Sequence, residues 1–144
     1  YFYHSDHLGS ASLITDSDGQ EYERIEYSPW GETWIDKAQA VWKTPCRFTG
    51  KEQDEETGLY YFGARYYDPK YSRWLSCDPA LEEYIPSSVQ QTTELPGLGG
   101  VYNSTNLNLY HYAGNNPVKY VDPDGRKIKP ITSRNYQNED KNKN

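Results

Sequence analysis

Tyrosine takes the place of the aliphatic residues that usually form a protein core. Of the 144 residues, 15 are Tyr, 4 are Trp and 3 are Phe, whereas only 35% are hydrophobic and the mean hydropathy is −1.03. A tyrosine ring buries well, but its hydroxyl group must find a hydrogen-bond partner. The composition therefore favours thin sheets, in which the hydroxyl group of each ring reaches solvent, over a thick aliphatic core.

Turn signals separate short runs of β-favouring residues along most of the chain. Residues 11–15 and 21–27 flank Asp16-Ser17-Asp18-Gly19, which predicts a β-hairpin. The run 59–67 carries apolar side chains on both faces, so we expect one strand that is covered on both sides. Further strands are expected at 74–75, 107–113 and 118–121. The fold class is mainly β, built from irregular antiparallel hairpins.

Three other segments differ from this pattern. Ala and Lys propensity predicts a short helix over 36–42. Residues 82–105 are rich in Pro, Gln, Thr, Ser and Gly, which is typical of a long loop insertion. Residues 127–144 are polar and predict a disordered tail, so the ordered segment is expected to be 1–126. Because the sequence contains no Met, we expect a fragment whose strands find partners elsewhere in a longer polypeptide.

Charge and hydropathy exclude several classes of function. The net charge is −6, and the part before Arg126 has 9 basic and 19 acidic residues, so that part repels phosphate and is not expected to bind nucleic acid. Without a run of roughly 20 apolar residues, no membrane span is expected. Cys46 and Cys77 are expected to be half-buried free thiols.

The histidines do not predict a metal centre. His4 and His7 flank Asp6, but two His without further ligands at a recognisable spacing are weak evidence for a metal. His111 alternates with Tyr on an expected strand, so we interpret it as a hydrogen-bonded structural residue. We expect no metal and no cofactor.

The turn and tyrosine segments carry a family resemblance. These segments are Tyr3-His4-Ser5-Asp6-His7-Leu8-Gly9-Ser10, Tyr27-Ser28-Pro29-Trp30-Gly31-Glu32, Arg47-Phe48-Thr49-Gly50-Lys51-Glu52, Gly58 to Pro69, Ser72 to Ser76 with Asp78-Pro79, and Asn108 to Tyr110 with Asn115 to Val118 and Asp122 to Gly125. In these segments the sequence resembles the repeat-associated core of Rhs and YD-repeat proteins, which is also found in the C subunit of Tc toxin complexes. About two thirds of the chain matches, outside 82–105 and 127–144.

The resemblance implies a fold and a role. Such proteins form a spiralling β-sheet that closes into a hollow shell around a cargo, usually a toxic C-terminal domain. This segment would lie at the end of the shell. The implied partners are the rest of the parent polypeptide, its C-terminal effector, and secretion or immunity proteins. The parent would be exported or associated with the surface of a bacterium.

The resemblance also implies self-cleavage by an intramolecular aspartyl protease with two Asp-Pro-x-Gly motifs. The matching catalytic residues are Asp78 and Asp122, with Arg73 as a basic group that stabilises them, and the cut would fall at Arg126–Lys127. One ionised carboxylate takes a proton from water, while the other stays protonated and polarises the scissile carbonyl. The first motif departs from the pattern, since Leu81 stands in place of Gly, and Arg126 stands where the family usually has Leu.

Two alternatives remain open. Asp-Pro-x-Gly also has the residues that a type I turn prefers, so Asp122 could serve the turn alone. The aromatic residues could instead form a carbohydrate-binding surface of an adhesin, although Tyr60, Phe62 and Tyr66 are better placed for burial.

Overall fold

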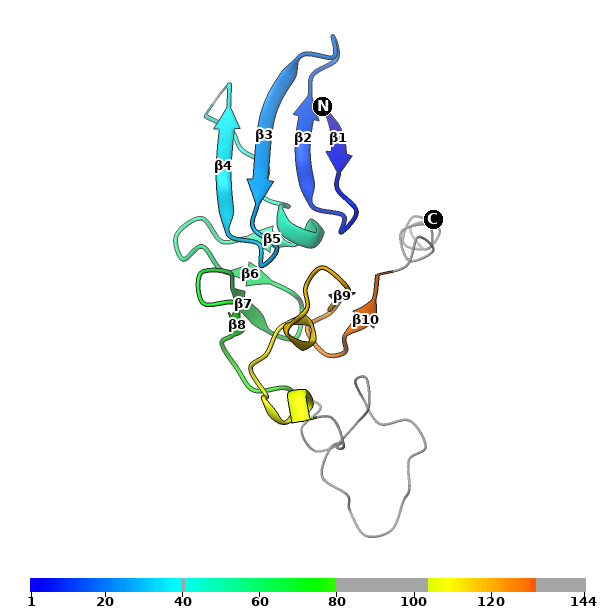
Figure 1. The fold of residues 1–144 in the computed structure, drawn as a ribbon. Helices are drawn as coiled ribbons and strands as arrows, with labels where there is room; N and C mark the ends of the chain where they lie inside the picture. The colour runs from blue at the N-terminus through cyan, green and yellow to red at the C-terminus, as the bar shows by residue number, and fades with distance from the viewer. Residues whose placement is uncertain (40, 80–103, 132–144) are drawn as a thin grey trace, which may run out of the picture.

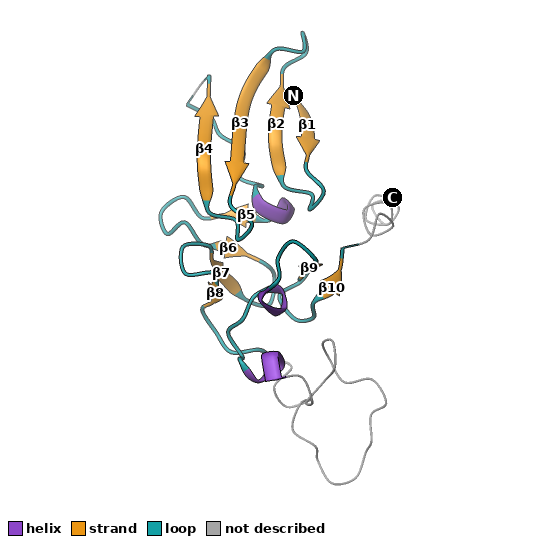
Figure 2. Cartoon of the chain, in the orientation of Figure 1, coloured by secondary structure: helices purple, strands orange, loops and turns teal. Residues whose placement is uncertain are grey.

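A computed structural model describes residues 1–39, 41–79 and 104–131 (Figure 1). These residues form short antiparallel strands joined by turns, and their helical content is confined to three short 3-10 helices (Figure 2). The expected mainly β class is confirmed. Residues 82–103 of the predicted insertion and residues 132–144 of the predicted tail lie outside the described residues.

The N-terminal sheet contains the four longest strands. Its strands are β1 (Phe2–Ser5), β2 (Ala11–Thr15), β3 (Glu21–Tyr27) and β4 (Thr33–Ala38), and neighbours in sequence are neighbours in the sheet. The hairpin predicted around Asp16 to Gly19 is therefore confirmed.

The short helix predicted over 36–42 is wrong. Asp36 pairs with Ile25 and Lys37 pairs with Arg24 in the ladder between β3 and β4. Pairing with a long neighbouring strand outweighs a helix propensity of a few tenths of a kcal/mol per residue. Position 40 lies outside the described residues.

The second sheet contains the segment 59–67, which was predicted to form one strand. That prediction is wrong: the segment folds into a hairpin of β6 (Tyr60–Tyr61) and β7 (Tyr66–Asp68), flanked by β5 (Glu52–Gln53) and β8 (Arg73–Trp74). The Phe62 N–H donates to the Arg65 carbonyl at 3.0 Å, and Gly63 has φ +99°, so the backbone reverses here.

Residues 104–131 are mostly turns packed against the second sheet (Figure 1). They contain η3 (Ser104–Leu107), η4 (Ala113–Asn115), β9 (Tyr120–Val121) and β10 (Lys129–Pro130). The strand predicted over 107–113 is wrong, because backbone turn bonds replace a ladder there and only a single bridge joins His111 to Arg73. Of the predicted strand 118–121, only the last two residues are β.

The core is a cluster of aromatic rings between the turns and the second sheet. Six side chains are at most 2% exposed, and their ring centroids lie 4.4–6.4 Å from their neighbours. These six are Phe48, Tyr60, Phe62, Tyr67, Trp74 and Tyr112.

Buried tyrosine hydroxyls find partners inside the chain. The Tyr67 hydroxyl donates to the Trp30 carbonyl at 2.7 Å, and the Tyr60 hydroxyl donates to the Gly31 carbonyl at 3.3 Å. Burial raises the pKa of Tyr60 to about 12. We expected each ring to keep its hydroxyl group in solvent and to need strands from outside the chain to cover it. Both expectations are wrong for this core.

Candidate functional site: two aspartates on one arginine

Arg65 connects three parts of the chain. It lies in the turn between β6 and β7, and its side chain is only 2% exposed. Its Nη1 lies 3.4 Å from Asp78 Oδ2, and its Nη2 lies 3.2 Å from Asp122 Oδ2. Its Nε donates to the Gly125 carbonyl at 2.6 Å. One buried guanidinium thus holds both aspartates that the sequence singled out.

Asp122 uses its two carboxylate oxygens differently. Its Oδ1 accepts the backbone N–H groups of Asp124, Gly125 and Arg126 at 2.9–3.4 Å, which closes the Asp-Pro-x-Gly turn. Its Oδ2 faces Arg65. Oδ1 therefore has the structural role in the turn that the sequence suggested. Oδ2 forms an ion pair with Arg65, which the turn itself does not require.

The same aspartate-capped turn recurs elsewhere. Asp6, Asp16 and Asp54 each accept two backbone N–H groups through Oδ1. None of these three has an ion pair among the described residues, whereas Asp122 does. The pairing with Arg65 distinguishes the last turn from the structural ones.

Glycine is required in that last turn. Gly125 has φ +74°, and a Cβ there would lie 3.1 Å from the Arg65 backbone nitrogen and 3.3 Å from Phe62 Cβ. Any larger residue would push the turn away from the arginine that binds its carbonyl group.

Arg73 lies outside this arrangement. It belongs to β8, and its side chain is exposed, so the basic partner of the aspartates is Arg65. Arg65 was missed because we expected it on one continuous strand. One signal was present in the sequence: an arginine inside the apolar run 59–67 must pair with carboxylates if that run is buried.

Burial and neighbouring charges set the protonation of the site. Burial raises the pKa of Asp122, although Arg65 acts in the opposite direction. The guanidinium carbon of Arg65 lies 4.2 Å from the Trp74 ring centroid, so an aromatic face covers the cation. Arg126 and Lys127, where the cut is expected, are exposed directly after this turn.

The remaining candidates lie apart from this site. His4 and His7 are exposed, and the described residues contain no cluster of three or more potential metal ligands. Cys46 and Cys77 are free but exposed, so the expectation of half-buried thiols is wrong. Within the described ranges, no helix is long and apolar enough to cross a membrane.

His111 also differs from expectation. It is buried, but neither ring nitrogen has a hydrogen-bond partner among the described residues, so the expected hydrogen-bonded role is wrong.

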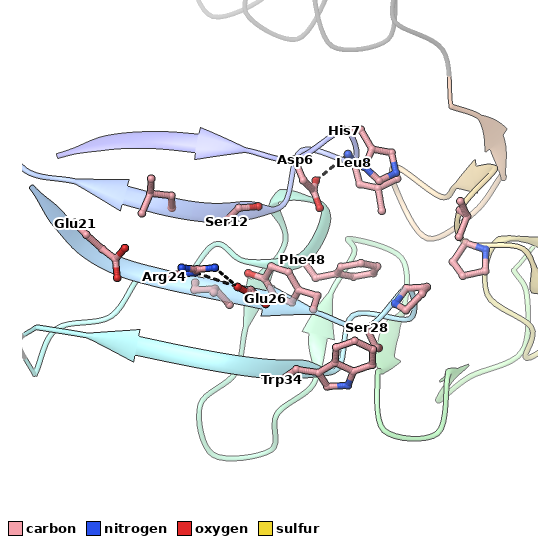
Figure 3. A pocket seen from close by; sticks show the side chains of 16 residues that line it. Asp6, His7, Leu8, Ser12, Glu21, Arg24, Glu26, Ser28, Trp34 and Phe48 are labelled. Atoms are coloured by element: carbon pink, nitrogen blue, oxygen red, sulfur yellow. Dashed lines mark hydrogen bonds and ion pairs between the residues drawn. The ribbon is translucent and has the colours of Figure 1, made fainter. Parts of the chain in front are cut away.

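A groove of about 710 Å³ runs along the N-terminal sheet (Figure 3). Leu13, Arg24 and Trp34 line it on the sheet, and Pro117 and Val118 line it from the C-terminal turns. Its lining does not include Arg65, Asp78 or Asp122.

Irregular antiparallel hairpins around a tyrosine core define a segment of a β-shell. Residues 1–118 match the teneurin YD-shell family model, and the chain belongs to this family. The resemblance to Rhs and YD-repeat proteins is thereby confirmed. The tRNA nuclease WapA of Bacillus subtilis is 39% identical over 126 residues, which cover 87% of this chain. Toxin subunit YenC2 of Yersinia entomophaga is 40% identical over 120 residues, which cover 81% of this chain.

Solved structures agree with this assignment. A crystal structure of TcdB2-TccC3 superposes with a TM-score of 0.64 and 38% identity, covering 85% of this chain and 5% of that one. The chain spans only 5% of WapA and 10% of YenC2. These two relatives are therefore much longer polypeptides, in which the matching part is a small segment.

Proposed function

We propose that this chain is the end segment of a YD-shell that encloses a C-terminal effector, and that it cuts the polypeptide in cis between Arg126 and Lys127. The observation that carries the proposal is the binding of Asp78 and Asp122 to the same buried guanidinium, directly before the proposed cut. Its partners would be the rest of the polypeptide and the effector.

The chemistry follows from the different surroundings of the two carboxyls. Burial favours the protonated form of Asp122, which suits a group that donates to the scissile carbonyl oxygen. Asp78 is then the base that takes a proton from water. Arg65 holds the Gly125 carbonyl, one residue before the proposed scissile bond, and so fixes the position of that bond.

Intact-mass measurement of the full-length protein tests this proposal. Wild type is expected to yield a fragment that begins at Lys127, whereas Asp122→Asn and Asp78→Asn are expected to remain undivided. Asp68→Asn is the matched control, because Asp68 also precedes a proline and caps a turn with Oδ1. It is expected to be cut like wild type. Equal, undivided masses for wild type and Asp122→Asn would remove the protease from the proposal.

A further inference from the structure

Several buried polar atoms of the residues around the paired aspartates have no hydrogen-bond partner. Among the described residues, five buried side-chain nitrogen or oxygen atoms lack one, and four of them belong to Arg65, Trp74 and His111. Three are Trp74 Nε1 and the two ring nitrogens of His111, and the fourth is Arg65 Nη1, which forms the ion pair with Asp78 but no hydrogen bond. Buried polar groups in native proteins almost always have a hydrogen-bond partner, so a group of exceptions at one place indicates a binding site for a polar ligand.

The backbone explains how His111 reaches this site. His111 forms a bridge with Arg73, and the Trp74 N–H donates to the Tyr110 carbonyl at 3.0 Å. The segment around His111 therefore lies against β8, beside the tryptophan that Arg65 covers. His111 is buried, with 5% of the residue exposed.

The charges around His111 define which ligand fits. Arg65 and Arg73 act on the ring as positive charges and Asp78 acts as a negative one. Burial and the two arginines lower the pKa of His111 below its ordinary value of 6.5, with Asp78 opposing them, which favours the neutral imidazole. The two arginines disfavour a metal cation. A neutral imidazole has one donor and one acceptor nitrogen, which suits a small neutral ligand.

We propose that His111 holds the water molecule that Asp78 activates during cleavage. This inference rests on the proposed function. One hydrogen of the water moves as a proton to the Asp78 carboxylate, while the other stays on the oxygen and donates a hydrogen bond to the unprotonated nitrogen of His111. The water oxygen bonds to the carbonyl carbon of Arg126 while Asp122 gives its proton to the carbonyl oxygen.

The intermediate then collapses. The carbonyl re-forms and its proton returns to Asp122, the bond from Arg126 to Lys127 breaks, and the leaving amine takes the proton from Asp78. The sum is one water added across one peptide bond, with no other reactant.

Two substitutions at His111 separate this role from a packing role. Phe keeps a ring of similar size but cannot hydrogen bond, whereas Gln is less well matched in shape but can accept from water. If His111 only packs, His111→Phe should cleave at least as fast as His111→Gln. If it holds the water, the order is reversed: cleavage by His111→Phe slows by about 100-fold, and His111→Gln slows by about 10-fold or less.

The measurement is the time course of cleavage of the full-length protein, followed by intact mass from pH 4 to pH 8 (roughly the range in which a perturbed His titrates). The acid limb of the rate profile is expected to become shallower in His111→Gln, because one titrating group is gone. His7→Phe is the matched control, since His7 is exposed and outside the site. Limited trypsin digestion of each variant verifies that the shell is folded.

The outcomes separate the two proposals. Wild type that stays intact at every pH overturns the proposed function together with the role of His111. Wild type that is cut, with His111→Phe cut equally fast or faster than His111→Gln, overturns the role of His111 and leaves the paired aspartates standing.

Discussion

Arg65 and Asp122 are separated by 57 positions in the sequence, yet their side chains meet at 3.2 Å in the interior. Asp78 approaches the same guanidinium from the segment after β8. The site therefore forms only when the hairpin of β6 and β7 and the last turn are packed together. The proposed cleavage can therefore begin only after this part of the chain has folded.

Removing the arginine should unfold the site. Arg65→Gln leaves two buried carboxylates without their cation, and breaking a buried pair in this way costs about 3–5 kcal/mol. Urea unfolding should show that loss in the free energy of unfolding. Arg24→Gln is the control, because its partner Glu26 is 43% exposed and such surface pairs are worth at most about 1 kcal/mol. Equal losses for both variants would contradict the central role of Arg65.

The raised pKa of Asp122 gives its contribution to stability a definite pH dependence. The folded pKa lies above the ordinary value of 3.8, so the folded state binds more protons than the unfolded state between the two values. This contribution to stability is greatest below pH 3.8 and falls as the pH rises through the folded pKa. Asp122→Asn should therefore become more stable relative to wild type as the pH increases through that window, measured by unfolding at each pH.

The contribution of Asp36 to stability should depend on pH in the opposite direction. Burial acts to raise its pKa, but the hydrogen bonds from Lys43 and Arg47 together outweigh burial and leave the pKa lowered. Its contribution is present above the ordinary pKa of 3.8 and is lost as the pH falls through the folded value. Asp36→Asn should therefore lose stability relative to wild type as the pH rises through this acidic window. If the stability of Asp36→Asn and of Asp122→Asn relative to wild type changed with pH in the same direction, one of the two assigned pKa shifts would be contradicted.

A second buried ion pair ties the N-terminal sheet to the segment before η1 (Phe48–Gly50). The Glu23 carboxylate accepts from the Thr44 N–H at 2.8 Å and from Arg47 Nη2 at 3.1 Å, and it is fully buried. Glu23→Gln removes the more buried of the two carboxylates that pair with Arg47, the other being Asp36, and should cost about 3 kcal/mol. Glu26→Gln on the same strand should change the unfolding free energy by less than about 1 kcal/mol.

Gly31 should be far less replaceable than Gly19. Both have positive φ, +83° and +77°, so alanine is strained at either position. At Gly31 the new Cβ would also lie 2.5 Å from the Phe48 ring, whereas at Gly19 nothing lies within 4 Å. Gly19→Ala should cost about 1 kcal/mol, and Gly31→Ala should cost a further 1–3 kcal/mol or so from overpacking, as measured by thermal unfolding. Similar melting temperatures would show that the ring moves aside freely.

The sequence predicted features that depend on neighbouring residues. The Asp16 to Gly19 hairpin and the Asp122 turn follow from local turn chemistry, and both were found. The length of a strand is different. The alternating aromatic residues at 59–67 match a single strand, but in the structure Tyr60 pairs with Tyr67, so this segment is a hairpin. Nothing in the alternation itself reports where the chain reverses.

The candidate site was predictable only in part. Asp78 and Asp122 were identified through family motifs, and Arg73 was taken as their basic partner because it matches a basic position in the segment just before Asp78. The ion pair between Arg65 and Asp122 joins residues 57 positions apart, which local patterns do not encode. His111, which we propose as a member of the site, was missed for a similar reason, because only packing places it against Arg73 of β8.

The enclosed indole of Trp74 provides an optical readout of this chain. It is 2% exposed beneath the Arg65 guanidinium, whereas Trp34 and Trp42 are 68% and 48% exposed. The fluorescence of Trp74 should be blue-shifted relative to that of Trp34 and Trp42, and acrylamide should quench Trp74 less than these two. Rapid-mixing experiments could then follow assembly of the arginine and its carboxylates in real time without attaching a dye.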